Sequence, residues 1–342
     1  MVRLKKGPSK TISIIDVARL AGVSITTVSR VINKLSTVKE KNRIKVLDAV
    51  KQLKFQPSVF AQRLATGKSN VVALVIPRYE GIFYSFYALE LIRGIGTLCE
   101  ALKLDLLLHL TDSRSKFNLR GVGGVIFADI IGNQQQVEEV LACGIPCVVI
   151  NQYVSDLEVN CIAIDNVAGA ESAVNYLISL GHRRIAHISG DVVTQAASQR
   201  LQGYKQALQK NKITLDEGII FKTDYSRGQA RLSAEKLLKA DKPASAVFVA
   251  SDAMALEVMA VARELGKKVP QDLSIVGFDD NPSGLYGPVA LTTVRQPLVQ
   301  MAEESVKVLN LLMSAKEPQK TKKILLPAEL VIRESCQPIK AA

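Results

Sequence analysis

Short runs of valine, isoleucine and leucine alternate with helix-length segments along most of this 342-residue chain. Continuous apolar runs of four to eight residues, bounded by Gly or Pro, are typical of parallel strands that are buried on both faces. Their alternation with helical segments predicts open parallel sheets with helices on both sides. Ligands of such sheets bind beyond the carboxyl ends of the strands. The runs are 71–77, 104–110, 124–127, 147–151, 184–189, 219–221, 246–250 and 273–277.

The first 70 residues differ from this body in charge. They hold 15 Lys and Arg against three acidic residues, a net charge of +12, which equals the net charge of the whole chain. The remaining residues are therefore neutral overall. A basic segment attached to a neutral body is the charge distribution expected of a protein that contacts nucleic-acid phosphates.

The basic segment is also patterned as a helix-turn-helix. Ser13 is placed to cap a first helix from about Ile14, with Val17, Ala18 and Leu20 facing inward. Gly22 supplies a tight turn, and Ser24 caps a second helix whose inner stripe is Val28, Val31 and Ile32. We therefore predict an all-α DNA-binding head over residues 1–56.

A third helix is predicted from Thr37, with Ile44, Leu47, Val50 and Leu53 as its core stripe. After Pro57, residues Ser58 to Ala65 are predicted to form a short helix, which is too short to be stable alone. We therefore predict that residues 57–69 are a hinge whose helix forms only in contact with DNA or with a second copy of the chain. Leu64 could act there as an apolar wedge in the minor groove.

The residues predicted to contact DNA lie mainly at the start of the second helix, because this part of such motifs reaches base edges. Arg30 could bind guanine as a bidentate donor. Heads of this kind read palindromic sites in pairs, so we expect a homodimer on a double-stranded operator. The predicted contact residues are Ser24, Ile25, Thr26, Thr27, Ser29, Arg30, Asn33, Thr37, Ser58, Ala61 and Leu64.

The head resembles the lactose/galactose-repressor (LacI/GalR) family almost residue for residue, and the likeness continues through the body. The motifs that carry it are Asp16-Val17-Ala18, Ala21-Gly22-Val23-Ser24, Thr27–Val31, Pro57, Leu64, Asp165–Ala170, Gly181–Ala186, Arg200–Tyr204, Ser251–Ala255, Val276–Asp280 and Leu291–Pro297. The resemblance implies a body at residues 70–342 made of two doubly wound parallel-sheet lobes, similar to periplasmic binding proteins. It implies an N-lobe at about 70–163 and 294–321 and a C-lobe at about 164–293 and 322–342.

One region departs from the family pattern. Only residues 111–121 separate two predicted strands of the N-lobe, whereas a parallel crossover normally needs a dozen or more residues. We expect the family's helix there to be reduced to a turn or two, or replaced by a loop.

The resemblance also implies a small polar effector, a sugar or sugar derivative, in the cleft between the lobes. Arg200, Asp252 and Tyr225 match family ligand residues, with a surface ion pair, a helix cap and a packed surface tyrosine as their structural alternatives. Asp129 and Asn151 end strands and are further candidates. An aromatic group could form the opposing wall, although a core or dimer-contact role is equally compatible with it: Tyr79, Phe83 and Tyr84.

The sequence favours a transcription regulator, most simply a repressor, over an enzyme. It has no phosphate loop, no GxSxG elbow and no Cys/His spacing for a metal, so we expect no catalytic residue, cofactor or metal. No apolar run reaches membrane-spanning length and no signal peptide is evident, which favours a cytoplasmic protein. Control by a protein corepressor and a purine-type or other non-sugar effector remain the alternatives.

Overall fold

The computed structural model describes residues 12–33, 37–55, 69–78, 82–112 and 118–339. The chain divides into two compact units, residues 1–69 and 70–342, which we call the head and the body. The predicted hinge lies mostly outside the described residues, and Ser58, Ala61, Leu64 and Tyr79 lie outside them too. No helix among the described residues is long and apolar enough to cross a membrane.

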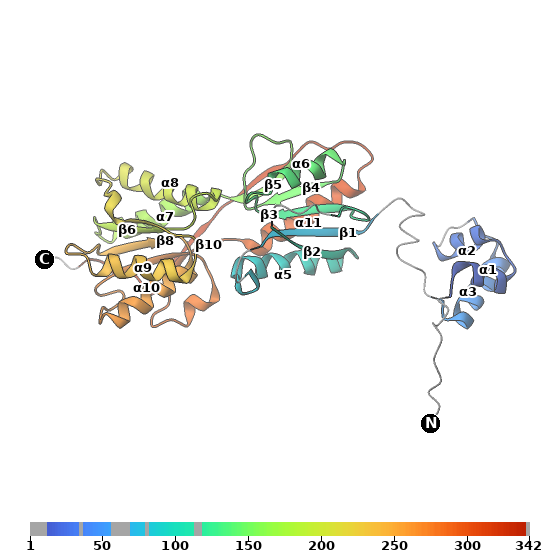
Figure 1. The fold of residues 1–342 in the computed structure, drawn as a ribbon, viewed down its shortest axis with the longest axis horizontal. Helices are drawn as coiled ribbons and strands as arrows, with labels where there is room; N and C mark the ends of the chain where they lie inside the picture. The colour runs from blue at the N-terminus through green and yellow to red at the C-terminus, as the bar shows by residue number, and fades with distance from the viewer. Residues whose placement is uncertain (1–11, 34–36, 56–68, 79–81, 113–117, 340–342) are drawn as a thin grey trace, which may run out of the picture. The chain divides into compact units, whose positions relative to one another are not determined.

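Three helices form the head: α1 (Ile14–Ala21), α2 (Ile25–Ile32) and α3 (Glu40–Leu53) (Figure 1). Ser13 caps α1 reciprocally, because its hydroxyl accepts from the Asp16 amide while the Asp16 carboxylate accepts from the Ser13 amide at 3.0 Å. Gly22 ends α1 at φ +63°, a left-handed conformation that glycine adopts without strain. The predicted helix-turn-helix is therefore confirmed.

The core of the head differs in part from the predicted stripes. Leu20, Ile44 and Leu47 were expected inside, but each is about half exposed, at 50%, 53% and 53%. On α3 the inner positions are Val46, Ala49, Val50 and Leu53. These four positions are spaced i, i+3, i+4 and i+7 and therefore lie on one helical face. The prediction is confirmed for Val50 and Leu53 and was wrong for Ile44 and Leu47.

The N-lobe contains a six-stranded parallel sheet in the order β11-β5-β4-β3-β1-β2. Helices α5 and α11 cover one face and α6 covers the other. The elements are β1 (Val71–Pro77), η1 (Ile82–Tyr84), α5 (Phe86–Ala101), β2 (Asp105–Thr111), β3 (Gly124–Ala128), α6 (Gln134–Ala142), β4 (Cys147–Ile150), β5 (Asn160–Ile164), α11 (Leu298–Ser314) and β11 (Lys323–Leu326).

The C-lobe sheet has the order β12-β10-β9-β8-β6-β7, and only β12 runs antiparallel to its neighbour. Helices α7 and α8 pack on one face, and α9 and α10 on the other. The elements are α7 (Asn166–Ser179), β6 (Ile185–Ser189), α8 (Gln195–Lys210), η2 (Glu217–Ile219), β7 (Ile220–Lys222), α9 (Arg227–Leu238), β8 (Ala246–Val249), α10 (Asp252–Glu264), β9 (Ser274–Asp279), η3 (Pro282–Leu285), β10 (Thr292–Arg295) and β12 (Glu329–Val331).

The chain crosses between the lobes three times: after β5, after β10 and between β11 and β12. The last two crossings fall later than the predicted limits at 294 and 322, because β10 still pairs with β9 and β11 still pairs with β5. Strands β5, β10, β11 and β12 were not among the runs identified from the sequence. Between β2 and β3, the described residues form no helix.

The backbones of helices α7 and α8 come into contact where the helices cross, at Gly203. A substitution at this position therefore tests the packing of the C-lobe. A Cβ atom at Gly203 would lie 2.3 Å from the Val167 carbonyl oxygen of α7. We expect Gly203→Ala to lower the free energy of unfolding by about 1–3 kcal/mol, measured by urea unfolding. Gly228→Ala is the matched control, since nothing lies within 4 Å of its Cβ position. Equal stability of the two variants would contradict the close crossing.

Candidate functional site

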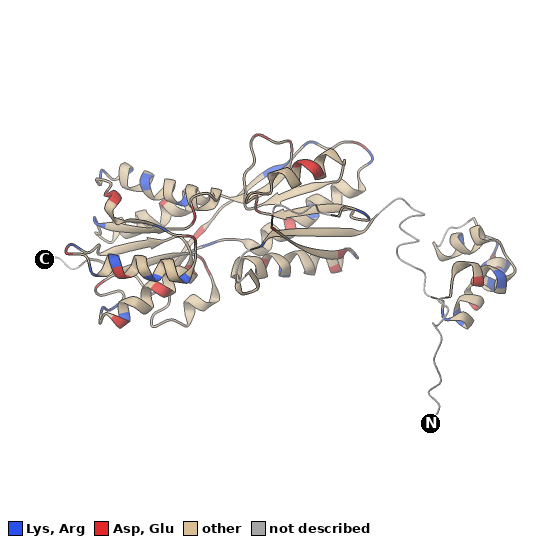
Figure 2. Cartoon of the chain, viewed as in Figure 1, with Lys and Arg blue, Asp and Glu red and all other residues tan. Residues whose placement is uncertain are grey.

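The outer face of the head is built on the start of α2. Ser24 caps this helix, and its hydroxyl accepts from the Thr27 amide at 3.2 Å. Ser24, Ile25, Thr26 and Arg30 are exposed, and Ile25 is 48% exposed although it is apolar. Thr27, Ser29 and Asn33 are half-buried on the same helix or at its end, and Thr37 is exposed ahead of α3. The structure thus presents the predicted α2 residues together. Figure 2 marks the Lys and Arg positions on the head in blue.

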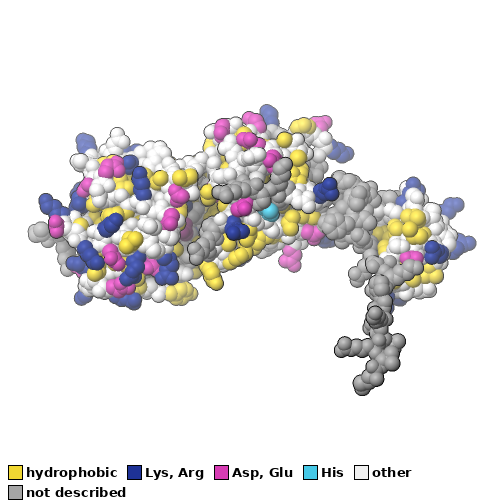
Figure 3. All heavy atoms as spheres, viewed as in Figure 1, with side chains coloured by type: hydrophobic (Ala, Val, Ile, Leu, Met, Phe, Trp, Pro, Cys, Tyr) yellow, Lys and Arg dark blue, Asp and Glu magenta, His cyan; other side chains and the backbone are white. Residues whose placement is uncertain are grey.

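The body carries its candidate site at the carboxyl ends of strands in both lobes. Asp129 follows β3, Asn151 follows β4, Tyr225 follows β7, and Asp279 ends β9. All four have positive φ, at 75°, 65°, 66° and 129°. Non-glycine residues in this region are uncommon and cluster at functional sites. Two cavities lie between the lobes, whose boundary is visible in Figure 3. Asp279 and Gln296 line the cavity of about 290 Å³, and Gln195 and Lys323 line the one of about 510 Å³.

On the N-lobe side, Asp129 and Asn151 form a buried pair. The Asn151 amide donates to Asp129 Oδ2 at 3.2 Å, and the Ile130 backbone amide donates to Asp129 Oδ1 at 2.8 Å. Burial raises the pKa of Asp129 to about 6, although these hydrogen bonds and the Arg200 charge oppose the shift. The buried Oδ1 atom of Asn151 accepts no hydrogen bond from any described residue.

On the C-lobe side, Arg200 is buried, at 3% exposure, which excludes the surface ion pair considered as its alternative. Its Nε donates to Asn166 Oδ1 at 2.9 Å and its Nη1 donates to the Ala250 carbonyl at 2.7 Å. The guanidinium lies 3.7 Å from the ring centroid of Phe278, and it approaches Asp279 to 3.9 Å. Arg200 is therefore held rigidly at the cleft.

Tyr225 lies against Gly190, where a Cβ atom would sit only 2.0 Å from the tyrosine ring. Glycine is needed at position 190 because of this contact. Burial raises the pKa of the Tyr225 hydroxyl, which stays protonated. The ring also packs against the C-lobe core, and its role in effector binding stays a prediction.

Two residues that the sequence interpretation did not single out complete this side of the site. Gln296 Nε2 donates to Asp279 Oδ1 at 2.6 Å, and the buried Gln296 Oε1 has no partner among the described residues. Burial raises the pKa of Asp279 to about 6 against the opposing charge of Arg200. Both residues follow or end a strand inside motifs that carried the family resemblance, so their position at strand ends was the signal that could have found them.

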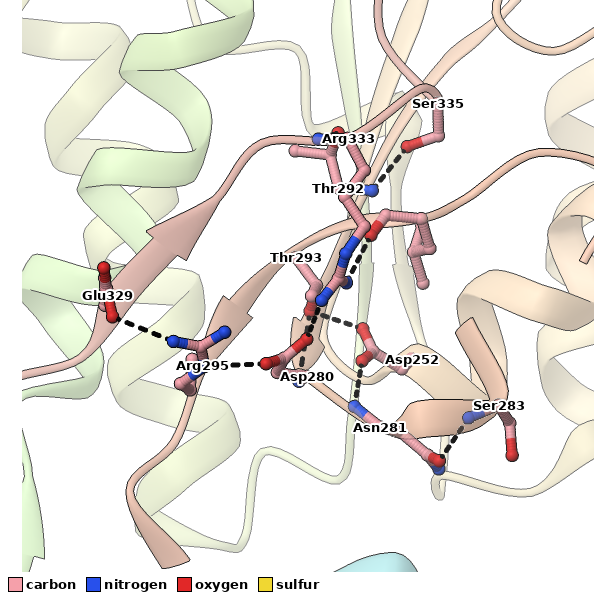
Figure 4. A network of polar contacts seen from close by, with 11 residues as sticks. Asp252, Asp280, Asn281, Ser283, Thr292, Thr293, Arg295, Glu329, Arg333 and Ser335 are labelled. Atoms are coloured by element: carbon pink, nitrogen blue, oxygen red, sulfur yellow. Dashed lines mark hydrogen bonds and ion pairs between the residues drawn. The ribbon is translucent and has the colours of Figure 1, made fainter. Parts of the chain in front are cut away.

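Asp252 was predicted to bind effector, but the structure gives it a different role (Figure 4). It is fully buried, and its two carboxylate oxygens accept from Thr293 Oγ1 at 2.6 Å and from the Asn281 backbone amide at 2.7 Å. Ser251, rather than Asp252, caps α10. Asp252 therefore anchors β10 and the segment after β9, and it does not present an oxygen to the cleft.

Asp280, next to the site, ties together the strands that lead to the other lobe. It accepts from Arg295 Nε at 2.7 Å and from Arg333 Nη2, and Arg295 also pairs with Glu329 at 3.2 Å (Figure 4). These ionic contacts join the ends of β9 and β10 to β12. The predicted aromatic wall is less defined, because Phe83 and Tyr84 are 58% and 93% exposed, and their role in effector binding stays a prediction.

Comparison with known proteins agrees with this arrangement. Residues 13–58 match the model of bacterial regulatory proteins of the lacI family, and residues 174–336 match a periplasmic binding protein-like domain. The HTH-type transcriptional regulator DegA of Bacillus subtilis is 36% identical over 338 residues, covering 96% of this chain and 98% of DegA. Catabolite control protein A of Priestia megaterium is 32% identical, covering 95% and 99%.

Among solved structures, the lac repressor dimer bound to operator and the anti-inducer ONPF aligns with a TM-score of 0.81 at 27% identity, covering 96% of this chain and all of that one. A helix-turn-helix head joined to a two-lobed binding body defines the class of DNA-binding regulators that respond to small ligands. The chain belongs to the LacI family of bacterial regulatory proteins.

The buried carboxylate of Asp129 generates a pH-dependent prediction. Its pKa is raised from 3.8 to about 6 on folding, so the cost of burying its charge is absent below pH 4 and complete above pH 6. Asp129→Asn should therefore increase the free energy of unfolding at pH 7.5, by on the order of 2 kcal/mol, and change it little at pH 4. Asparagine tolerates the positive φ at this position.

Urea unfolding followed by circular dichroism at the two pH values would measure this effect. Asp241→Asn, at an exposed position of the C-lobe, serves as the control and should leave stability unchanged at both. A lower free energy of unfolding for Asp129→Asn at pH 7.5 would contradict the prediction that burying the Asp129 charge destabilises the protein.

Proposed function

We propose that the protein is a repressor that binds a palindromic operator as a homodimer, and that a small polar effector in the cleft controls its DNA affinity. The proposal rests on two features that occur together in this chain. Helix α2 is capped and has an exposed outer face, and the cleft of the body contains buried polar atoms of Asn151 and Gln296 that have no partner among the described residues. Operator DNA lies in the bacterial cytoplasm, so we infer that the protein works there and has no catalytic role.

Relatives support this reading. The HTH-type transcriptional repressor PurR of Vibrio cholerae is 32% identical and the ribose operon repressor of Halalkalibacterium halodurans is 31% identical, so regulators of different operons lie at similar distances. A solved regulator is named as a complex with cellobiose. We favour a sugar-like effector, because the carboxylates, amides and guanidinium of the candidate site suit a ligand that is rich in hydroxyl groups.

For DNA recognition, we propose that Ile25, Thr26 and Arg30 read base edges from α2. Arg30 is exposed and is the one basic residue on this helix. After selection of the operator from random DNA, Arg30→Ala should weaken operator binding by roughly 10- to 100-fold and non-specific binding much less. Arg120→Ala, an exposed substitution in the body, is the control. Equal losses on operator and random DNA would contradict base reading by Arg30.

The dimer and the salt dependence are tested on the same preparation. Light scattering should show a dimer at micromolar concentration, and a symmetric footprint should cover both half-sites. The logarithm of operator affinity should fall steeply with the logarithm of salt concentration, because the basic head displaces counterions. A stable monomer or a flat salt dependence would count against the proposal.

A second candidate is control by a protein partner. The edge strand β2 exposes Leu107 and Leu108, at 43% and 38%, next to the short connection to β3. Exposed apolar side chains on an edge strand suit a protein contact. A small molecule that changes operator affinity of the purified protein, with no other protein present, would remove this candidate.

A further inference from the structure

One contact between the two lobes lies away from the places where the chain crosses between them. Gln195 is the first residue of α8 in the C-lobe, and its side chain meets the backbone of Tyr153 in the N-lobe. The Tyr153 amide donates to Gln195 Oε1 at 2.7 Å, and Gln195 Nε2 donates to the Tyr153 carbonyl at 3.0 Å. The side-chain amide thus exchanges two hydrogen bonds with one backbone residue, as paired residues of antiparallel strands do. We call this pair the interlobe latch.

On the N-lobe side, the latch is attached to a segment that is itself held in place. Val154 is 5% exposed and packs in the N-lobe core. Gln152 Oε1 accepts from the backbone of the loop after β3 at 3.1 Å, and the Ser155 carbonyl accepts from Lys323 Nζ of β11 at 3.3 Å. These contacts lie on both sides of Tyr153 in the chain. A bond to the Tyr153 backbone is therefore a bond to the N-lobe as a whole.

On the C-lobe side, the latch belongs to a helix that carries a residue of the candidate site. The Thr194 hydroxyl caps the start of α8. Arg200 lies on the same helix, little more than one turn after Gln195. In the N-lobe, Tyr153 follows Asn151 by two residues. The latch therefore joins two elements that hold candidate-site residues of opposite lobes.

The lobes leave space around the latch. A cavity of about 510 Å³ lies beside it and is lined by both latch residues and by Asp165. Further hydrogen bonds between the lobes are found where the chain crosses, from the Asp165 amide to the Leu326 carbonyl at 3.0 Å and from Gln296 to Asp279. Because a cavity adjoins the latch, its two hydrogen bonds can separate without disrupting a packed core.

We infer that the latch holds the lobes together on this flank without any ligand, and that Gln195 sets how far the body is closed before a ligand binds. The three crossings act as hinges, and rotation that opens this flank must break the latch. Two hydrogen bonds of this kind shift the equilibrium between latched and open lobes by roughly 5- to 100-fold. Glutamine suits this role because its amide offers a donor and an acceptor together, whereas glutamate has no donor.

Distances between spin labels on the full-length protein test the latch. Figure 1 shows α6 of the N-lobe and α8 of the C-lobe on the same side of the body. The labels are attached to native Cys143, exposed after the end of α6, and to Gln209→Cys, near the end of α8. Cys336→Ser is present in every variant so that this half-buried thiol is not labelled. Labelled protein is mixed with an excess of unlabelled protein, so that distances within one chain dominate.

Gln195→Ala should lengthen and broaden the distance distribution, and the Tyr153 amide should exchange its hydrogen at least about 5-fold faster. Gln195→Glu is the second variant, because it keeps the size of the side chain but places a carboxylate oxygen against the Tyr153 carbonyl. It should also open the lobes. Ser198→Ala, exposed on the same helix, is the matched control and should change neither readout. A distance distribution that is the same in the parent and in both Gln195 variants would overturn the inference.

Operator binding measured on the same variants separates the latch from the proposed function, on which the latch itself does not depend. If Gln195→Ala opens the lobes and operator affinity stays the same, the latch stands, and control of DNA binding through the body is contradicted. If an added ligand changes operator affinity while both Gln195 variants keep the parent distances, the latch is wrong and the effector-controlled repressor stands.

Discussion

The buried guanidinium of Arg200 is the interaction on which the C-lobe side of the cleft depends. It joins the start of α7 through Asn166, the end of β8 through Ala250 and the end of β9 through Phe278 and Asp279. A buried cation needs such partners, because an unpaired one would be costly to bury. Asp279 then holds Gln296, and Gln296 stands where the chain leaves β10 for the other lobe. The Arg200 side chain therefore connects the candidate site to an interlobe crossing through Asp279 and Gln296.

Each side of the cleft has a carboxylate that accepts a hydrogen bond from a side-chain amide, but the Arg200 charge acts on the two carboxylates to different degrees. Asp279 has Arg200 at 3.9 Å, whereas for Asp129 the charge of Arg200 is the weakest of the influences that oppose burial. The N-lobe side is therefore the one where a carboxylate is held mainly by neutral donors, from Ile130 and Asn151. A ligand between the lobes would meet a compensated carboxylate on one side and a poorly compensated one on the other.

The sequence predicted features that depend on local rules and missed those that depend on tertiary partners. The caps Ser13 and Ser24 and the turn at Gly22 follow from backbone requirements within a few residues, and all three are found. The face of α3 was misjudged because Ile44 and Leu47 are hydrophobic, although Val46 and Ala49 lie inside. Asp252 was misassigned because its partners, Thr293 and the Asn281 amide, are some 30 to 40 residues away. Residue type at a strand end indicated the candidate site, but it could not distinguish a carboxylate that anchors neighbouring strands from one that is left for a ligand.

The left-handed backbone at the strand ends also limits how this site can diversify. Positions 129, 151 and 279 hold Asp or Asn, residue types whose short polar side chains tolerate positive φ, and glycine tolerates it better still. β-branched and bulky residues are strained there. New ligand preferences in this scaffold are therefore reached most readily by exchanging Asp, Asn and Gly at these three positions, which changes charge and hydrogen bonding while the path of the chain is kept.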